Sequence, residues 1–417
     1  MPKSSACSVL SHMNDVGFLP SFPLAAANIM LVGAILLCGL AVGQIFVRVL
    51  RLPRITGFVA AGLVLGPGAL GLLDQTMLGQ LSIFVDISLG LILFELGRRL
   101  DLRWFTHDRW LLVSSVAESL LSFLFVYGIL RLFDIAPVYS AAAAAIAMAT
   151  SPAVLIMIVH DQRAKGPLTE RLLALTALNN VFAFLLIALL FGFVHLEYRA
   201  DWLRAVSHPL YLIVGSAGLG YLAFIAARTL SRWLGKREDS QFVMLLGLIV
   251  GTVGCAISFK LSVLLAMLSF GVFAKNLDRD HDLMAVEFGP GGQFFLVMLF
   301  VITGAGLRPS ELPVAGAVGA SFVIARLAGK LAGIGLFAPL SGITRKKALL
   351  LGIGLVPMSA IAVVMVQGAA TLNPEFGAKL SSIVLSAVVI LELVGPLATQ
   401  WALRRAGEAE PVSGAST

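Results

Sequence analysis

Charged side chains are scarce in this chain: Asp, Glu, Lys and Arg together make up 13% of its 417 residues, whereas hydrophobic residues make up 59%. Soluble domains carry roughly 25% charged residues, so this balance excludes an ordinary soluble protein. Apolar runs of about 18–20 residues or more recur along the whole chain, and each can span a hydrocarbon core of about 30 Å. The composition therefore predicts a polytopic membrane protein whose first partner is the lipid bilayer.

Patterns for catalysis and metal binding are also lacking. The three cysteines, Cys7, Cys38 and Cys255, are odd in number and two lie in apolar runs, which argues against a disulfide framework. The histidines have no metal-ligand spacing, and the glycine pairs have no strand–turn–helix setting for a nucleotide. We therefore expect no catalytic residue, no metal, no cofactor and no enzymatic activity. The net charge of +7 comes mostly from loop arginines and lysines and does not predict a nucleic-acid partner.

The apolar runs predict an all-α membrane protein of about thirteen transmembrane helices. An N-terminal tail, 1–23, precedes the membrane domain, 24–405, and a C-terminal tail, 406–417, follows it. The expected helices cover residues 24–47, 55–73, 80–97, 110–132, 138–160, 169–194, 209–230, 241–259, 261–277, 289–307, 313–340, 346–371 and 379–403.

The basic residues predict the orientation of this bundle. Of the 30 lysines and arginines, 21 fall on one side of the predicted helices and seven on the other. Because cytoplasmic loops are enriched in Lys and Arg, the richer side is expected to be cytoplasmic. An odd number of spans then places the N-terminus outside and the C-terminus in the cytoplasm, with the protein in the cell inner membrane.

Two prolines at a fixed offset indicate an internal repeat. Pro152 and Pro357 are 205 residues apart, and the same offset brings 55–62 near 261–268. Each copy holds five spans, an odd number, so the second copy must be inverted in the membrane, as in many secondary transporters. The two copies are expected at about 54–195 and 261–405.

These prolines also predict two broken helices. Proline inside a helix removes one hydrogen bond and clashes with the preceding turn, and freed backbone groups must line a cavity or meet other protein groups. Thr150, Ser151 and Ser359 are placed to meet them. One proline alone would favour an ordinary kink, but Pro152 and Pro357 at the repeat offset favour two breaks that cross near mid-membrane and form a polar, ion-accessible centre.

Few charged residues lie inside the spans, where a charge costs at least about 2.5–3.5 kcal/mol. Lys330 lies deep in its span, with Arg326 one turn earlier on the same face, and we favour a functional role for Lys330. Glu118 is mid-span without a local cation and should pair with Arg326 or Lys330. A local salt bridge with a neighbouring arginine is the expected role of Glu95, and Glu392 is interpreted as structural.

Eight segments carry a resemblance to a known family by their order and spacing: 55–71, 91–102, 149–153, 177–180, 261–276, 294–307, 326–333 and 392–405. Together they resemble the transmembrane part of the monovalent cation:proton antiporter-2 family, a sodium/hydrogen exchanger-like domain. The resemblance implies a core domain of crossed broken helices that moves like an elevator against a dimerisation domain, and hence a homodimer. It also maps the family's aspartates onto Asn179 and Asn180, and its lysine onto Lys330.

The asparagine pair departs from this family pattern. In the family an aspartate alternates between a proton and a cation, whereas the amides of Asn179 and Asn180 do not titrate near neutral pH. At about 4 Å and an effective dielectric of about 20, the missing opposite charge removes about 4 kcal/mol of attraction for a cation. The two asparagines alone should therefore bind sodium poorly, and they leave Lys330 without its usual partner.

Three functions follow from this departure. The favoured one is antiport of protons against a monovalent cation, sodium or potassium, with the negative charge relocated to Glu118 or Glu95, or with Lys330 itself carrying the proton. The second is a carrier for an anion or organic acid, which an uncompensated Lys330 beside two amides would attract. The third is a non-transporting scaffold. The proposed ion or substrate site comprises Thr150, Ser151, Pro152, Asn179, Asn180, Lys330, Pro357 and Ser359, with auxiliary charges from Glu118, Glu95 and Arg326.

Overall fold

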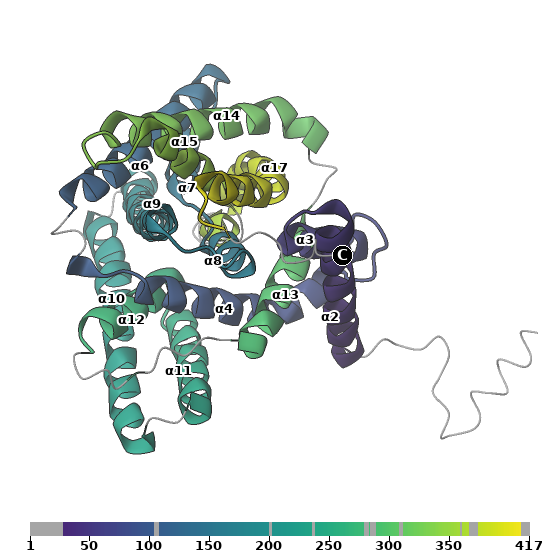
Figure 1. Cartoon of the computed structure of the whole chain (residues 1–417). Helices are drawn as coiled ribbons and strands as arrows, with labels where there is room; N and C mark the ends of the chain where they lie inside the picture. Colours follow the sequence, from purple (N-terminus) through teal and green to yellow (C-terminus); the bar gives the residue numbers. More distant parts are fainter. Residues whose placement is uncertain are drawn as a thin grey trace, which may run out of the picture.

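The computed structural model describes residues 28–103, 108–199, 202–235, 238–278, 283, 289–307, 312–358, 361–366 and 374–409. Within these ranges the protein is helical and has no strand (Figure 1). The elements are α2 (Asn28–Ile45), the π-helical η1 (Phe46–Leu50), α3 (Arg54–Leu65), α4 (Gln75–Arg98), α6 (Arg109–Leu132), α7 (Pro137–Met148), α8 (Pro152–Asp161), α9 (Pro167–Arg199), α10 (Trp202–Leu234), α11 (Glu238–Ser258), α12 (Val263–Asn276), α13 (Gly289–Gly306), α14 (Leu312–Phe337), α15 (Arg345–Gly354) and α17 (Pro374–Ala406).

About thirteen transmembrane helices were predicted, and the described helices can be grouped into thirteen. This grouping counts α2 with η1, α7 with α8, and α15 with the helical residues 361–366 as one each. Within the described residues nine segments are long and apolar enough to span a bilayer alone, and α3, α12 and part of α13 are shorter apolar helices. Several predicted boundaries were wrong. α3 ends at Leu65 rather than at 73, α4 begins at Gln75 rather than at 80, and α17 begins at Pro374 rather than at 379. α10 begins at Trp202 rather than at 209, and Pro209 lies inside it.

Several helices begin at a residue whose side chain accepts a hydrogen bond from the first turn. Asp74 accepts from the amide of Met77 at the start of α4, and Asp108 accepts from that of Leu111 at the start of α6. Ser262 does the same for α12, and Thr344 for α15. Each such bond satisfies one of the backbone N–H groups that a helix start leaves without a partner.

The helices form two groups (Figure 1). In one group α6 packs along α14, α7 packs on α9, and α15 packs on α17. In the other α3 packs on α13, α4 on α12, and α10 on α11 and α12. Figure 1 shows α14 and α6 along one side, α4 and α13 along the opposite side, and α7, α8, α9 and α17 between them. The interrupted helices therefore lie inside the bundle.

Two helix crossings of the second group are made by reciprocal glycines. A Cβ atom at Gly62 of α3 would lie 2.1 Å from a backbone oxygen of α13, and one at Gly304 of α13 would lie 2.4 Å from a backbone oxygen of α3. Gly97 of α4 and Gly271 of α12 stand in the same relation, at 2.4 and 2.2 Å. Glycines allow this close approach of backbones in membrane helices. The matched pairs α3–α13 and α4–α12 are the ones that two inverted repeats would form.

Both predicted breaks are present. The first half-helix, α7, ends at Met148, and α8 starts at Pro152 after three non-helical residues. The second, α15, ends at Gly354, and residues 355–358, which include Pro357, are not helical. The amide of Ser151 donates to the carbonyl of Pro357 at 2.9 Å, so the two interruptions touch. Proline therefore ends the regular helix here rather than only bending it.

Candidate functional site

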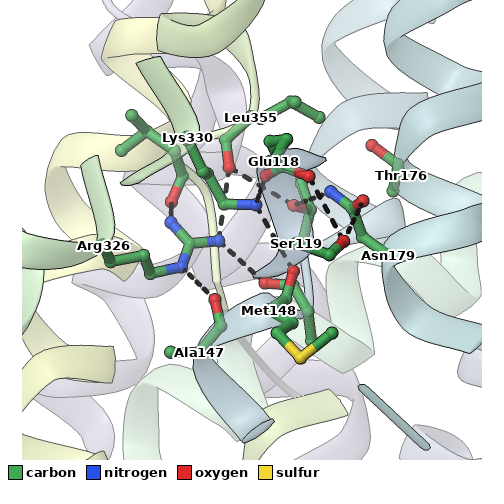
Figure 2. Close-up of polar contacts among 12 residues, drawn as sticks. Glu118, Ser119, Ala147, Met148, Thr176, Asn179, Arg326, Lys330 and Leu355 are labelled. Atoms are coloured by element: carbon green, nitrogen blue, oxygen red, sulfur yellow. Dashed lines mark hydrogen bonds and ion pairs between the residues drawn. The ribbon is translucent and has the colours of Figure 1, made fainter. Parts of the chain in front are cut away.

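A buried ion pair joins α6 and α14, the two helices of the first group that pack along each other. Lys330 of α14 donates from Nζ to Oε1 of Glu118 of α6, and both side chains are 0% exposed (Figure 2). The same ammonium lies 3.3 Å from the carbonyl oxygen of Met148, at the end of α7. In a low-dielectric interior each charge needs the other, because an unpaired one would carry a desolvation cost of several kcal/mol.

Glycines beside Lys330 make this contact possible. A Cβ atom at Gly333 would lie 2.3 Å from Cα of Glu118, and one at Gly329 would lie 2.5 Å from Cα of Ser122. The two helices therefore pack backbone against backbone on both sides of the ion pair. A lysine flanked in this way reaches a carboxylate on the facing helix without leaving the α6–α14 interface.

The guanidinium of Arg326 holds the carbonyl ends of both breaks. Its side chain is fully buried, one turn before Lys330. From the first break it binds the carbonyls of Ala147 (2.8 Å) and Ala149 (2.7 Å), and from the second those of Leu355 (3.2 Å), Val356 (2.6 Å) and Pro357 (3.4 Å). The C-terminal ends of α7 and α15 carry unsatisfied carbonyls and partial negative charge, which a buried cation offsets.

Asn179 and Asn180 come from α9, and Figure 2 shows Asn179 on the opposite side of the ion pair from Arg326. Oδ1 of Asn179 lies 3.0 Å from the hydroxyl of Ser119, which is also 3.4 Å from Oε2 of Glu118. Nδ2 of Asn179 donates to Oγ1 of Thr150 at 3.3 Å. Nδ2 of Asn180 donates to the carbonyls of Thr150 (2.8 Å) and Thr176 (2.7 Å). A chain of polar contacts thus connects Asn179 through Ser119 to the Glu118 carboxylate, as Figure 2 shows.

One acceptor in this cluster has no partner. Oδ1 of Asn180 is buried and accepts no hydrogen bond from any described residue. Buried amide oxygens are almost always satisfied, so an unsatisfied one beside a polar centre is a position where a ligand can bind.

The residues of the first break meet the second break directly. Thr150 Oγ1 lies 3.4 Å from the carbonyl of Leu355, and the hydroxyl of Ser151 accepts from the amide of Val154, capping α8. Pro152 occupies the first position of α8, where its missing N–H costs nothing. Ser359 lies outside the described residues, so its predicted role stays a prediction.

The structure therefore gathers most of the predicted residues. It brings together Thr150, Ser151, Pro152, Asn179, Asn180, Lys330, Pro357, Glu118 and Arg326. Glu95 is separate from them. It is about one third exposed near the end of α4 and pairs with Arg99 at 3.0 Å, which confirms the predicted local salt bridge.

The predicted pairing of Glu118 with Arg326 or Lys330 is confirmed, and the uncompensated Lys330 of the organic-acid alternative is not found. Of the two partners considered for Glu118, the structure selects Lys330, because Arg326 is occupied by the break carbonyls. The ammonium is therefore compensated, and the reason for expecting an anion there is removed.

Sequence reasoning missed Ser119. The signal for it is a polar stripe at helical spacing on α6, formed by Ser115, Glu118, Ser119 and Ser122, all of them buried. The hydroxyls of Ser115 and Ser122 have no hydrogen-bond partner among the described residues. A polar stripe in a lipid-spanning helix faces protein or water rather than lipid, which marks this face of α6 as part of the site.

The chemistry of the cluster is that of oxygen donors around one carboxylate. The Glu118 carboxylate, the amide oxygens of Asn179 and Asn180, and the hydroxyls of Ser119 and Thr150 are hard ligands, which suit small inorganic cations. In the part of the chain that the structure describes, no group of three His, Cys, Asp or Glu side chains is arranged to bind a metal ion. The cluster combines a titratable pair with neutral oxygens in a buried, polar position.

Solved structures with a similar fold include two of the sodium proton antiporter MjNhaP1 from Methanocaldococcus jannaschii. The structure determined at pH 8 has a TM-score of 0.64 at 16% sequence identity, covering 90% of this chain and 95% of that one. The structure from an electron-microscopy map has a TM-score of 0.67 at 18% identity, covering 92% and 98%. At these identities the likeness establishes the fold.

No curated protein matches the chain in sequence. The family described as "sodium/hydrogen exchanger, transmembrane" matches residues 32–405, which is most of the chain. The chain therefore belongs to the sodium/hydrogen exchanger transmembrane family.

Proposed function

We propose that this protein is a monovalent cation:proton antiporter in which the Glu118–Lys330 pair does the work of the family's aspartates. The observation that carries the proposal is the fully buried Glu118–Lys330 contact, linked through Ser119 to Asn179. Membership of the exchanger family and a fold shared with a sodium proton antiporter support it. Sodium and potassium are the candidate cations, exchanged for protons.

The exchange follows from competition for one carboxylate. In this conformation the Lys330 ammonium is bound to the Glu118 carboxylate. A metal cation that binds the same carboxylate would lie about 4 Å from that ammonium, and two like charges at this distance repel by about 4 kcal/mol at an effective dielectric of about 20. Binding of the cation therefore expels a proton from Lys330 to the side of the membrane to which the site is open. Release of the cation then lets Lys330 take up a proton again. One positive charge is held at a time.

Neutral oxygens complete the proposed cation site. Asn179 and Asn180 contribute their amide oxygens, and the one on Asn180 is already without a partner. The hydroxyls of Thr150 and Ser119 contribute beside them. Because amides carry no charge, the site depends on Glu118 for its negative charge. Arg326 is a positioning residue that keeps the carbonyl ends of the breaks together.

An elevator movement fits the two groups of helices. The group that contains the breaks, α6–α9 with α14, α15 and α17, would move as the core domain. The group with α2–α4 and α10–α13 would remain fixed and form the homodimer. Exposed apolar side chains on α10 and α11, such as Val214 and Val243, are consistent with a surface that faces lipid or a second copy. Repeats at about 54–195 and 261–405, a membrane domain over 24–405 with short tails, and an N-outside, C-cytoplasmic orientation in the inner membrane complete the proposal.

The test is a flux assay with purified protein in proteoliposomes. A pH-sensitive dye inside the vesicles reports proton movement when sodium, potassium or lithium is added outside. The proposal expects exchange in the parent protein and none in Lys330→Ala. The matched control is Glu95→Gln, because that carboxylate lies outside the cluster and should leave exchange unchanged.

Other outcomes select the other functions. Unaltered exchange in Lys330→Ala rejects the proposed mechanism. Uptake of a radiolabelled carboxylic acid without cation exchange would identify an organic-acid carrier. Absence of every flux from a correctly folded protein would identify a scaffold.

A further inference from the structure

A second buried carboxyl group lies outside the site described above. Glu392, in α17, has 0% of its surface exposed. Neither of its carboxyl oxygens has a hydrogen-bond partner, and no ion pair includes it among the residues the structure describes. Buried polar groups are bonded in roughly nine cases out of ten, so a carboxyl with both oxygens unsatisfied is unusual. Glu118, with a lysine against it, is the contrasting case in the same protein.

Glu392 is on the face of α17 that packs against the second break. Gly395, one turn later, approaches Pro357 so closely that a Cβ atom there would lie 2.7 Å from Cα of Pro357. Thr399, another turn on, donates from Oγ1 to the carbonyl of Gly354 at 3.0 Å. Residues three and seven positions apart share a helix face, so Glu392 faces the same interface. Figure 1 shows α17 beside α15 and α7 in the interior of the bundle.

The charged groups on neighbouring helices either have other partners or lie toward the helix ends. The helices that pack on α17 are α3, α7, α8, α9, α14 and α15. On α14, Lys330 pairs with Glu118, and the guanidinium of Arg326 binds break carbonyls. The other charged or titratable residues on these helices whose side chains the structure describes lie toward the helix ends: Arg54, Tyr139, His160, Asp161, Glu170, Arg171, Arg345, Lys346 and Lys347. None of them forms an ion pair or a hydrogen bond with Glu392.

We propose that Glu392 is a second proton-binding site, occupied by a proton in this conformation. An ionised carboxylate buried without a partner costs far more free energy than the neutral acid, which carries no net charge. The proton is held as O–H on one carboxyl oxygen. It leaves when movement of the second break brings water or a cationic group to the carboxylate, so proton release is coupled to the rearrangement of Pro357 and its neighbours.

The site has a consequence for exchange, which rests on the proposed function. If Lys330 releases one proton for each cation and Glu392 releases another, two protons move against one cation. The exchange then transfers net charge, and a membrane potential forms. Without Glu392 the exchange is one for one and transfers no net charge.

Two measurements on the full chain in lipid vesicles test this proposal. Infrared spectra in H2O and D2O detect the carbonyl stretch of a protonated carboxyl group, and this band is expected in the parent protein and absent from Glu392→Gln. A voltage-sensitive dye is expected to report a potential during cation exchange by the parent protein and none with Glu392→Gln, which still exchanges cations. Glu95→Gln is the matched control and should keep both signals.

The outcomes separate this proposal from the antiport proposal. A parent spectrum without the band, or a band unchanged in Glu392→Gln, overturns the proton site whether or not exchange is found. A lost band in a protein that shows no exchange supports the proton site and rejects antiport. If Glu392→Gln fails to fold, Glu392→Asp keeps a carboxyl group in a new position, and its band must shift; an unshifted band overturns the proposal.

Discussion

The backbone amide of Ser151 donates a hydrogen bond of 2.9 Å to the carbonyl oxygen of Pro357, which joins the two helix interruptions directly. Around this contact the Arg326 guanidinium donates hydrogen bonds to carbonyl oxygens of both breaks, and Lys330 lies one turn further along α14. Freed backbone groups inside a membrane protein must be met by other protein groups or by a ligand. The crossing is therefore held together by the same helix that carries the titratable lysine.

The first prediction concerns the ion pair. Glu118→Gln should lower the free energy of unfolding by about 3–5 kcal/mol, because it leaves the Lys330 ammonium buried without its counter-charge. It should also abolish cation exchange. Thermal unfolding in detergent and the vesicle flux assay measure the two effects.

A double variant separates stability from function. Glu118→Gln combined with Lys330→Met removes both charges, so it should recover much of the lost stability. Exchange should remain absent, since no titratable pair is left. Recovery of exchange in the double variant would show that another group carries the charge.

Much of this centre could be predicted from the sequence, because its residues break the rule that membrane helices are apolar. Lys330, Arg326 and the paired prolines stand out against their surroundings for that reason. The choice between Lys330 and Arg326 as the partner of Glu118 could not be predicted. It depends on the rotation of α14 against α6, which the close packing of Gly329 and Gly333 determines.

Other contacts left only a partial mark in the sequence. The polar stripe on α6 indicates that Ser119 faces protein, but the identity of its partner arises only because α9 places Asn179 opposite it. The same holds for Glu408, which falls in the predicted C-terminal tail. Short-range polar contacts between distant segments depend on the three-dimensional packing, and periodicity along the chain does not encode them.

The second prediction distinguishes the two asparagines. In Asn179→Asp the new carboxylate oxygens face the hydroxyls of Ser119 and Thr150, both of which can donate to it. This variant should fold and should bind a cation at least about tenfold more tightly than the parent protein does. About 1.4 kcal/mol of added attraction is enough for a tenfold gain in affinity. Isothermal titration with sodium or potassium measures the affinity.

Asn180→Asp is the matched comparison and should behave in the opposite way. Nδ2 of Asn180 donates to two carbonyls, those of Thr150 and Thr176. A carboxylate oxygen in that position would face two acceptors, so unfolding should become easier by about 1–3 kcal/mol. Equal stability of the two aspartate variants would contradict the hydrogen-bond assignment.

The third prediction concerns the close approach of α6 and α14. A methyl group at Gly333 would lie 2.3 Å from Cα of Glu118, so Gly333→Ala must push the helices apart. We expect a loss of about 1–3 kcal/mol in stability and a sharp fall in exchange, because the ion pair is displaced. Gly335→Ala is the control two residues away. No atom lies within 4 Å of its added methyl group, and it should be neutral or stabilising by up to about 1 kcal/mol.

The last prediction concerns Glu408, which follows α17 and caps the start of α9. Its carboxylate accepts from the amides of Leu168 (2.9 Å) and Thr169 (2.7 Å) and from the hydroxyl of Thr169 (2.8 Å). The negative charge also complements the positive end of the helix that carries Asn179.

Glu408→Ala should therefore lower stability by about 0.5–2 kcal/mol and loosen the first turn of α9. Hydrogen exchange of the amides at 168–170 measures the loosening. A chain shortened to end at 409 keeps this contact and should match the parent protein, whereas a chain that ends at 406 should behave as Glu408→Ala does. Because α9 also carries the proposed cation ligands, the rate of cation exchange should be measured in all three proteins. A changed rate in Glu408→Ala and in the chain that ends at 406, but not in the chain that ends at 409, would show that this cap influences transport.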